Sequence, residues 1–170
     1  MLCYHVDRTG NLKPYQTINL FKPNIDPAIF EQTLSELYPE GISEHGNHYL
    51  IQSYDGFQRD TTTEQIFELY RKMYFLDKPT RFQSFFAFPK LEQAKQFYFQ
   101  YSNFSPYTQI FKISVEDQKY HIGDMNLLRG DTILQCHQNA IDYWSGKICP
   151  SSVLEILIVP PVKILDRLTL

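Results

Sequence analysis

The segment from Val153 to Leu165 constrains the fold most, because it is an apolar β-type run broken by one glutamate, one lysine and a pair of prolines. Its sequence predicts a strand over Leu154–Val159 and a second extended piece over Val162–Leu165. Proline cannot donate to a central β-ladder, so Pro160-Pro161 forces a bend or an edge position. Two strands and one bent strand both satisfy this pattern.

Glu155 is the residue of this run that needs an explanation. An ionised glutamate is rarely buried in a strand, because partners must offset the desolvation of its charge. Alternation along the strand places Glu155 on the same face as Leu157 and Val159, which are apolar. Glu155 is therefore either a solvent-facing carboxylate on an edge strand or a working group in a cleft, and its apolar face favours the cleft.

Composition predicts one globular domain over residues 1–170, since 170 residues with 43% hydrophobic side chains can bury a real core. A net charge of -3 and the lack of a basic stripe argue against nucleic acid or an anionic membrane as the main partner. Three cysteines without a CxxC pair suggest neither a disulfide framework nor a thiolate zinc site.

The first residues carry neither a basic region nor an apolar core of a signal peptide, and nowhere do about 18 apolar residues follow one another. The sequence therefore predicts no membrane span. We expect a cytoplasmic protein, or one that is exported without a classical signal peptide.

The first half of the chain contains one strand pattern and two helix patterns. Met1–Val6 is mostly apolar and predicts a strand, and Asp26-Pro27 predicts the start of a helix that ends before Pro39. Overlapping capping boxes in Thr61–Gln65 and an apolar stripe predict a helix from about Thr63 to Phe75. Between the two helices, Gly41–Asp60 is polar and predicts a long loop in which only Tyr49–Ile51 resembles a strand.

The second half mixes strands and helices irregularly. The aromatic segment Arg81–Phe88 predicts a buried strand, and Lys90–Tyr101 predicts a helix. A strand over Thr108–Val115, a less regular piece over Tyr120–Leu128 and a helix over Thr132–Trp144 follow. This irregular order favours an α+β fold over a doubly wound sheet.

Three further residues are candidates for chemistry. The ring of His5 can donate and accept a hydrogen bond at once, although a lone histidine on a strand is more often structural. Arg81 suits a carboxylate or phosphate partner, or else a salt bridge at the rim. The hydroxyl of Ser84 can bind a ligand or its own backbone. His45 and His48 are three residues apart but have no third ligand nearby for a metal.

Taken in order, three pieces of the chain resemble the ADP-ribosyltransferase superfamily. Tyr4-His5-Val6-Asp7 resembles the Tyr-His opening of its histidine-type branch, and Ser84–Phe88, which leads into a helix, is similar to the middle motif. Leu154–Pro161 resembles the Glu-Val-Leu-Ile-Pro-Pro segment of mono-ADP-ribosyltransferases. The chain also resembles a bacterial domain family of unknown function with similar Arg-Phe-Gln-Ser and Gly-Asp-Met-Asn-Leu-Leu segments and a similar proline pair.

The resemblance implies an ADP-ribosyltransferase-like split β-sheet core with flanking helices. It implies NAD as the substrate and no metal, with cleavage of the nicotinamide-ribose bond and transfer of ADP-ribose to an acceptor, such as a protein, that the sequence does not identify. By analogy such a protein is a toxin or an effector. Two alternatives stay open: a NAD glycohydrolase that uses the same cleft, and an inactive nucleotide-binding or protein-binding module on the same fold.

The resemblance also assigns roles to residues. Glu155 would be catalytic, because a carboxylate on a ribose hydroxyl favours the positive charge that builds up as the bond to nicotinamide breaks. Ser84 would belong to the NAD-binding middle motif. The other predicted NAD contacts are His5 to ribose hydroxyls, Phe85 or Phe86 stacked on nicotinamide, and Arg81 paired with the pyrophosphate. Arginine is not implied as the acceptor, because Val153 replaces the Glu or Gln of arginine-modifying members.

Overall fold

The computed structural model describes residues 1–52, 58–102 and 107–169. These residues form a mixed α+β fold with two antiparallel sheets, which confirms the predicted class. The strands are β1 Leu2–Asp7, β2 Thr17–Ile18, β3 Phe85–Ala87, β4 Gln109–Ser114, β5 Tyr120–Asp124, β6 Leu154–Ile158 and β7 Val162–Leu168. The helices are α1 Ala28–Leu37, α2 Glu44–Leu50, α3 Gln58–Tyr74, α4 Leu91–Ser102 and α5 Ile133–Trp144, with short 3₁₀ helices at Arg81–Gln83 and Met125–Leu127. Within this part of the chain, no helix is both long and apolar enough to cross a membrane.

The two sheets meet at one corner of the fold. Their strand orders are β1-β4-β7-β2 and β3-β6-β5, so β6 is the central strand of the smaller sheet. The open edge of β3 is linked to β1 through Tyr4 and Phe88, whose backbone N–H groups each donate to the other's carbonyl at 2.9 and 2.7 Å. This link places the strand of His5 directly beside β3.

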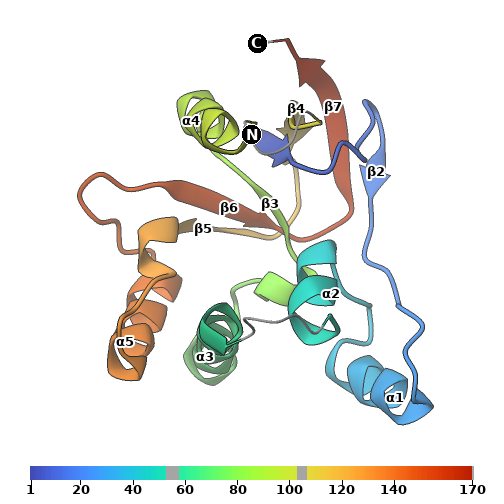
Figure 1. Cartoon of the computed structure of the whole chain (residues 1–170), viewed down its shortest axis with the longest axis vertical. Coiled ribbons are helices and arrows are strands. Elements are labelled where there is room, and N and C mark those ends of the chain that lie inside the picture. Colours follow the sequence, from blue (N-terminus) through green and yellow to red (C-terminus); the bar gives the residue numbers. More distant parts are fainter. Residues whose placement is uncertain (53–57, 103–106, 170) are drawn as a thin grey trace.

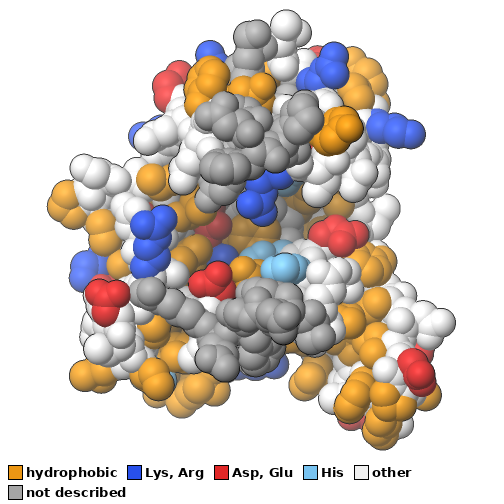
Figure 2. Space-filling view, viewed as in Figure 1, with side chains coloured by type: hydrophobic (Ala, Val, Ile, Leu, Met, Phe, Trp, Pro, Cys, Tyr) orange, Lys and Arg blue, Asp and Glu red, His pale blue; other side chains and the backbone are white. Residues whose placement is uncertain are grey.

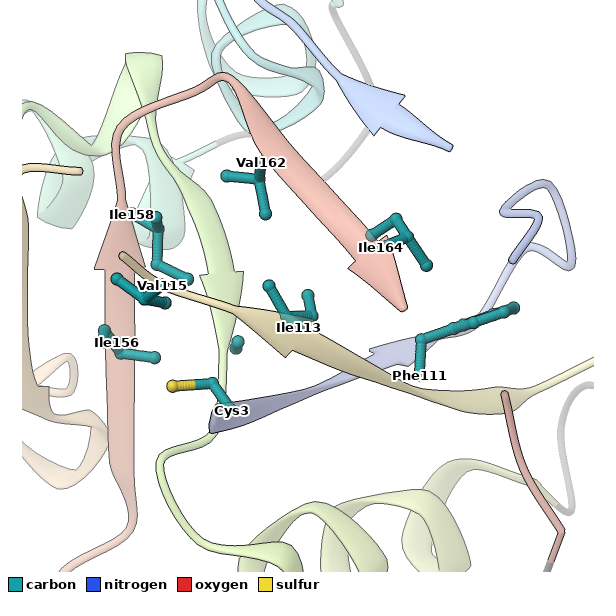
Figure 3. Close-up of a cluster of buried hydrophobic side chains, with 9 residues drawn as sticks. Cys3, Phe111, Ile113, Val115, Ile156, Ile158, Val162 and Ile164 are labelled. Atoms are coloured by element: carbon teal, nitrogen blue, oxygen red, sulfur yellow. The ribbon is translucent and has the colours of Figure 1, made fainter. Parts of the chain in front are cut away.

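Apolar side chains fill the space between the two sheets and the space between the smaller sheet and its helices. Ile156 and Ile158 on β6 point into the first core, with Ile113 and Ile164 from the larger sheet (Figure 3). Leu157 points the other way, into a core built with α3 and α5. Figure 1 shows α3 and α5 on one side of the smaller sheet and α4 on the other. Alternation along β6 therefore turns Glu155, like Leu157, toward the helices.

The C-terminal run forms two strands rather than one bent strand. β6 belongs to the smaller sheet and β7 to the larger one, and Pro160-Pro161 lies between them. Because neither proline has a backbone N–H, this is the place where the chain can leave one sheet and enter the other without breaking a ladder. The feature that the sequence singled out is thus the crossover between the two sheets.

The predicted strand over Arg81–Phe88 is wrong in its first half. Arg81–Gln83 is a 3₁₀ turn, in which the hydroxyl of Thr80 accepts the backbone N–H of Phe82 at 3.3 Å, and only Phe85–Ala87 is a strand. The turn buries Arg81 and Phe82 together, at 3% and 1% exposure, which successive residues of a strand with one buried face could not achieve.

The predicted loop over Gly41–Asp60 is also wrong in part. Glu44–Leu50 is a helix capped by Ser43, whose hydroxyl accepts the N–H of Gly46 at 3.3 Å. Tyr49 and Leu50 therefore end a helix and do not begin a strand. The glycine and two histidines of this segment are poor helix formers, so its propensity did not predict the helix. Residues 53–57 of the predicted loop lie outside the described residues.

Two predicted helix starts differ from the structure. The first helix begins at Ala28 with Pro27 at its N-cap and no side-chain cap, so Asp26 does not cap it. The third helix covers most of the predicted span but begins at Gln58. Glu64 therefore lies inside the helix rather than in a capping box, and its side chain is free to serve another purpose.

Candidate functional site

A buried ionic cluster lies between the smaller sheet and α3. It consists of Glu64, Arg81, Tyr143 and Glu155 and is called the Arg81 cluster below. Arg81 donates from Nε and Nη2 to the two carboxylate oxygens of Glu64 at 2.8 and 3.0 Å. Its Nη1 donates to Oε1 of Glu155 at 2.5 Å and to the hydroxyl of Tyr143 at 2.8 Å. The Tyr143 hydroxyl donates in turn to the same Oε1 at 2.7 Å.

Burial and charge together set the protonation states in the Arg81 cluster. Burial opposes the charged form of Glu64, but the charge of Arg81, together with that of His45 when its ring is protonated, outweighs it and holds the pKa of Glu64 well below its usual range. Burial likewise opposes a charged Arg81, yet Glu155 and Glu64 hold its pKa well above the ordinary value. Burial, followed by the charge of Glu155, raises the pKa of Tyr143 far above its usual value, so this hydroxyl stays a neutral donor.

Glu155 is not a solvent-facing carboxylate, because only 5% of its surface is exposed. Both of its hydrogen bonds end on Oε1, and Oε2 accepts none from the residues that the structure describes. Two carboxylates also share the single guanidinium of Arg81. The Arg81 cluster therefore offers one carboxylate oxygen that accepts no hydrogen bond from a described residue and, with both glutamates ionised, one unbalanced negative charge.

A glycine opposite Glu155 leaves room for the ring of Tyr143. Gly123 on β5 pairs with Glu155 on β6. A Cβ atom at Gly123 would lie 2.2 Å from the ring of Tyr143, which is closer than any real contact. The bare backbone of Gly123 is therefore what lets Tyr143 lie against the strand and reach the carboxylate of Glu155.

The two predicted stacking residues lie on opposite faces of β3. Phe86 faces the Arg81 cluster: its ring centroid lies 5.0 Å from Cζ of Arg81 and 4.5 Å from the ring of His45. Phe85 belongs to the core between the sheets, and its ring lies 4.4 Å from that of His5. β3 thus has the ring of His5 on the face of Phe85 and the Arg81 cluster on the face of Phe86.

His5 is fixed on the open edge of β3. Its Nδ1 lies 2.6 Å from the carbonyl oxygen of Phe86, which can only accept, so Nδ1 carries the proton. Burial lowers the pKa of His5, and the ring is neutral at pH 7. Its Nε2 is then an acceptor, and no hydrogen bond from the described part of the chain occupies it.

The hydroxyl of Ser84 is buried and makes a hydrogen bond within the protein. Its side chain is 1% exposed, and its hydroxyl donates to the carbonyl of Thr80 at 2.7 Å. Of the two predicted alternatives, the bond to its own backbone is the one that the structure contains. The structure therefore groups Phe86, Arg81 and Glu155 on the helix side of the smaller sheet and leaves His5 beside Phe85 on the other side of β3, whereas the Ser84 hydroxyl closes the turn after Arg81.

The sequence did not single out Glu64 or His45. The sequence predicts Glu64 as part of a capping box, and it places His45 in a loop, where it is only a weak candidate for a metal ligand. Glu64 precedes Phe67 by three residues, so it shares a helix face with an apolar stripe, which is the signal that could have identified it. Nε2 of His45 lies 3.2 Å from Oε1 of Glu64, but the angle between them makes no hydrogen bond, and Nε2 is buried without a partner among the described residues.

One face of the molecule is hollowed (Figure 2). Figure 2 shows a hollow across the middle of one face, with histidine and acidic side chains along it. A separate surface pocket of about 400 Å³ lies along Glu116–Lys119 and Val159–Pro161 and contains no residue of the Arg81 cluster. The Arg81 cluster and this pocket therefore lie in different places, and the buried charges are what mark the candidate site.

The lack of a side chain at Gly46 lets α2 pack closely against the turn that carries Arg81. A Cβ atom at Gly46 would lie 2.3 Å from the carbonyl oxygen of Phe82, a backbone atom that cannot move away alone. We expect Gly46→Ala to lower the free energy of unfolding by about 1–3 kcal/mol, as overpacking does. Urea unfolding measures this change, with His48→Ala on the exposed side of the same helix as the control. Equal stability of the two variants would contradict this account of the packing.

Comparison with known proteins gives a family for the chain. No curated protein matches it. One family profile matches residues 3–169, a range that contains His5, β3 and every residue of the Arg81 cluster. The chain therefore belongs to the family described as protein of unknown function (DUF2441).

Proposed function

We propose that the protein is a NAD-dependent ADP-ribosyltransferase that cleaves the nicotinamide-ribose bond and transfers ADP-ribose to an acceptor. The observation that carries this proposal is the buried carboxylate of Glu155, which Arg81 and Tyr143 hold through Oε1 while Oε2 accepts no hydrogen bond from the described residues. The two antiparallel sheets, linked at one corner, suit the split core of an ADP-ribosyltransferase-like fold.

The charge of the Arg81 cluster fits the reaction. As the bond to nicotinamide breaks, positive charge develops on the ribose, and a fixed negative charge nearby stabilises that state. Two glutamates on one arginine supply this charge without rearrangement, because the guanidinium and the Tyr143 hydroxyl hold the carboxylate in place. Oε2 of Glu155 is the oxygen that would accept a hydrogen bond from a ribose hydroxyl.

In this proposal, the other residues make separate contacts with NAD or orient Glu155. The neutral ring of His5 presents Nε2 as an acceptor for a ribose hydroxyl, and Phe85 beside it offers an aromatic face. Arg81 already binds two carboxylates, so in this proposal it orients Glu155. A pyrophosphate could pair with Arg81 only by displacing one of those carboxylates.

A binding module that does not cleave NAD is the second candidate. The observation in its favour is that Oε1 of Glu155 already accepts two hydrogen bonds inside the protein. Hydrolysis of NAD by water would use the same site as transfer does. Three measurements separate these functions: NAD binding, nicotinamide release and the fate of the ADP-ribosyl group.

The purified protein is expected to bind NAD and to release nicotinamide. Titration calorimetry measures the binding, and chromatography of the reaction mixture measures free nicotinamide and free ADP-ribose. Free ADP-ribose in the same amount as nicotinamide would show hydrolysis, and a deficit would show transfer. Binding without release would support a nucleotide-binding module, and no heat of binding would rule out both enzymes and favour a protein-binding module.

A further inference from the structure

The helix α2 is fixed to the turn of Arg81 by backbone contacts. The N–H and the hydroxyl of Ser43 both donate to the carbonyl of Phe82, at 2.9 and 3.1 Å. The close approach at Gly46 adds to this contact. His45, between these two residues, is therefore placed by the same packing that places Arg81.

The ring of His45 lies among groups from three elements. Phe86 of β3 lies 4.5 Å away and Tyr49 of α2 lies 4.7 Å away, both measured between ring centroids. From α3, Oε1 of Glu64 lies 3.2 Å from Nε2. The charged group beyond Glu64 is Arg81, which also touches the ring of Phe86. His45 is thus connected to Glu155 through Glu64 and then Arg81.

The two sides of the His45 ring face different surroundings. Nε2 is buried next to a carboxylate, whereas 20% of the side chain is exposed. A carboxylate beside one ring nitrogen favours the proton on that nitrogen, so the other nitrogen becomes the proton acceptor, as in nucleophile-activating histidines. A small rotation of the ring would give Nε2 the hydrogen bond to Glu64 that it lacks.

We propose that His45, oriented by Glu64, takes the proton from the acceptor of the ADP-ribosyl group, and that this acceptor is a hydroxyl compound. The inference rests on the proposed function and names its acceptor class. A hydroxyl keeps its proton at neutral pH and needs a base to become a nucleophile, whereas an ionised carboxylate needs none. His45 has a carboxylate beside its buried Nε2, and 20% of its side chain is exposed, so it has both the partner and the access that such a base requires.

The step balances without any further reactant. The O–H bond of the acceptor breaks, and its proton goes to Nδ1 of His45. The hydroxyl oxygen forms a bond to C1′ of the ribose, while the bond from C1′ to the nicotinamide nitrogen breaks. The electron pair of that bond neutralises the pyridinium, and nicotinamide leaves uncharged. Nothing is oxidised or reduced.

His45→Gln tests the inference with NAD as substrate and methanol as the hydroxyl probe. Wild type is expected to form methyl ADP-ribose together with ADP-ribose. The variant should form both products about 100-fold more slowly, the lower end of what a positioned base contributes, and should bind NAD as wild type does. His48→Gln, the same change three residues later on α2 at an exposed position, is the matched control and should react like wild type.

A second variant separates proton transfer from packing. His45→Ala should recover part of its rate when imidazole is added, because a free base can enter the space left by the ring, and no structural role predicts such recovery. Normal rates for His45→Gln would overturn the inference, and so would a wild type that modifies the guanidinium compound agmatine but not methanol. A wild type that binds no NAD would instead overturn the proposed function on which the inference rests.

Discussion

Replacement of Arg81 by methionine is expected to lower the free energy of unfolding by about 3–5 kcal/mol, the cost of removing one partner from a buried ion pair. Methionine fills a similar volume, so the loss comes from charge and not from a cavity. The change leaves the carboxylates of Glu64 and Glu155 without the guanidinium that both of them bind. The two side chains are 7% and 5% exposed, so water cannot replace this partner. Chemical denaturation measures the loss.

Two comparisons make this prediction specific. Arg71 on α3 also binds a glutamate with two nitrogens, but Glu68 keeps a hydrogen bond from the Thr80 hydroxyl at 2.8 Å and has Lys72 at 3.9 Å. Arg71→Met should therefore cost clearly less. Adding Glu64→Gln to Arg81→Met should restore part of the lost stability, because it removes one of the two buried carboxylate charges that have lost Arg81. A double variant less stable than the single one would contradict the assignment.

Glu155→Gln is expected to have the largest effect on activity, lowering the rate of nicotinamide release by about 100-fold or more. Glutamine keeps the shape of the side chain, and its oxygen can still accept from Arg81 and Tyr143. What it removes is the negative charge and the free carboxylate oxygen. Stability should fall by only about 1–2 kcal/mol, because Arg81 keeps both of its bonds to Glu64.

The measurement is nicotinamide release at saturating NAD, with melting temperature and NAD affinity determined in parallel. Glu116→Gln removes a carboxylate on the exposed turn after β4 and is the control. Release at the wild-type rate by the Glu155 variant would show that this carboxylate is structural. Loss of release in both variants would point to net charge and not to the site.

Local patterns predicted much of the fold. Alternation and the proline pair predicted that Glu155 lies on an apolar face and that the chain turns after Val159. Periodicity predicted α4 and α5 to within a residue or two at each end. These features depend on neighbours along the chain, which a sequence displays directly.

Contacts between distant segments could not be predicted in the same way. The turn at Arg81 and the helix at Glu44–Leu50 contradict local propensity and are held by tertiary contacts with Glu64 and with Phe82. Glu64 is 17 residues from Arg81, and Glu155 is 74 residues from it. No pattern within one element shows that a single guanidinium will serve both carboxylates.

The position of β6 has a consequence for how the protein is made. β6 is the central strand of the smaller sheet, yet it comes after both of its neighbours in the chain. Until it inserts between β3 and β5, Arg81 has Glu64 but lacks Glu155. During synthesis the candidate site therefore stays incomplete until β6 has been made, after both of the strands between which it inserts.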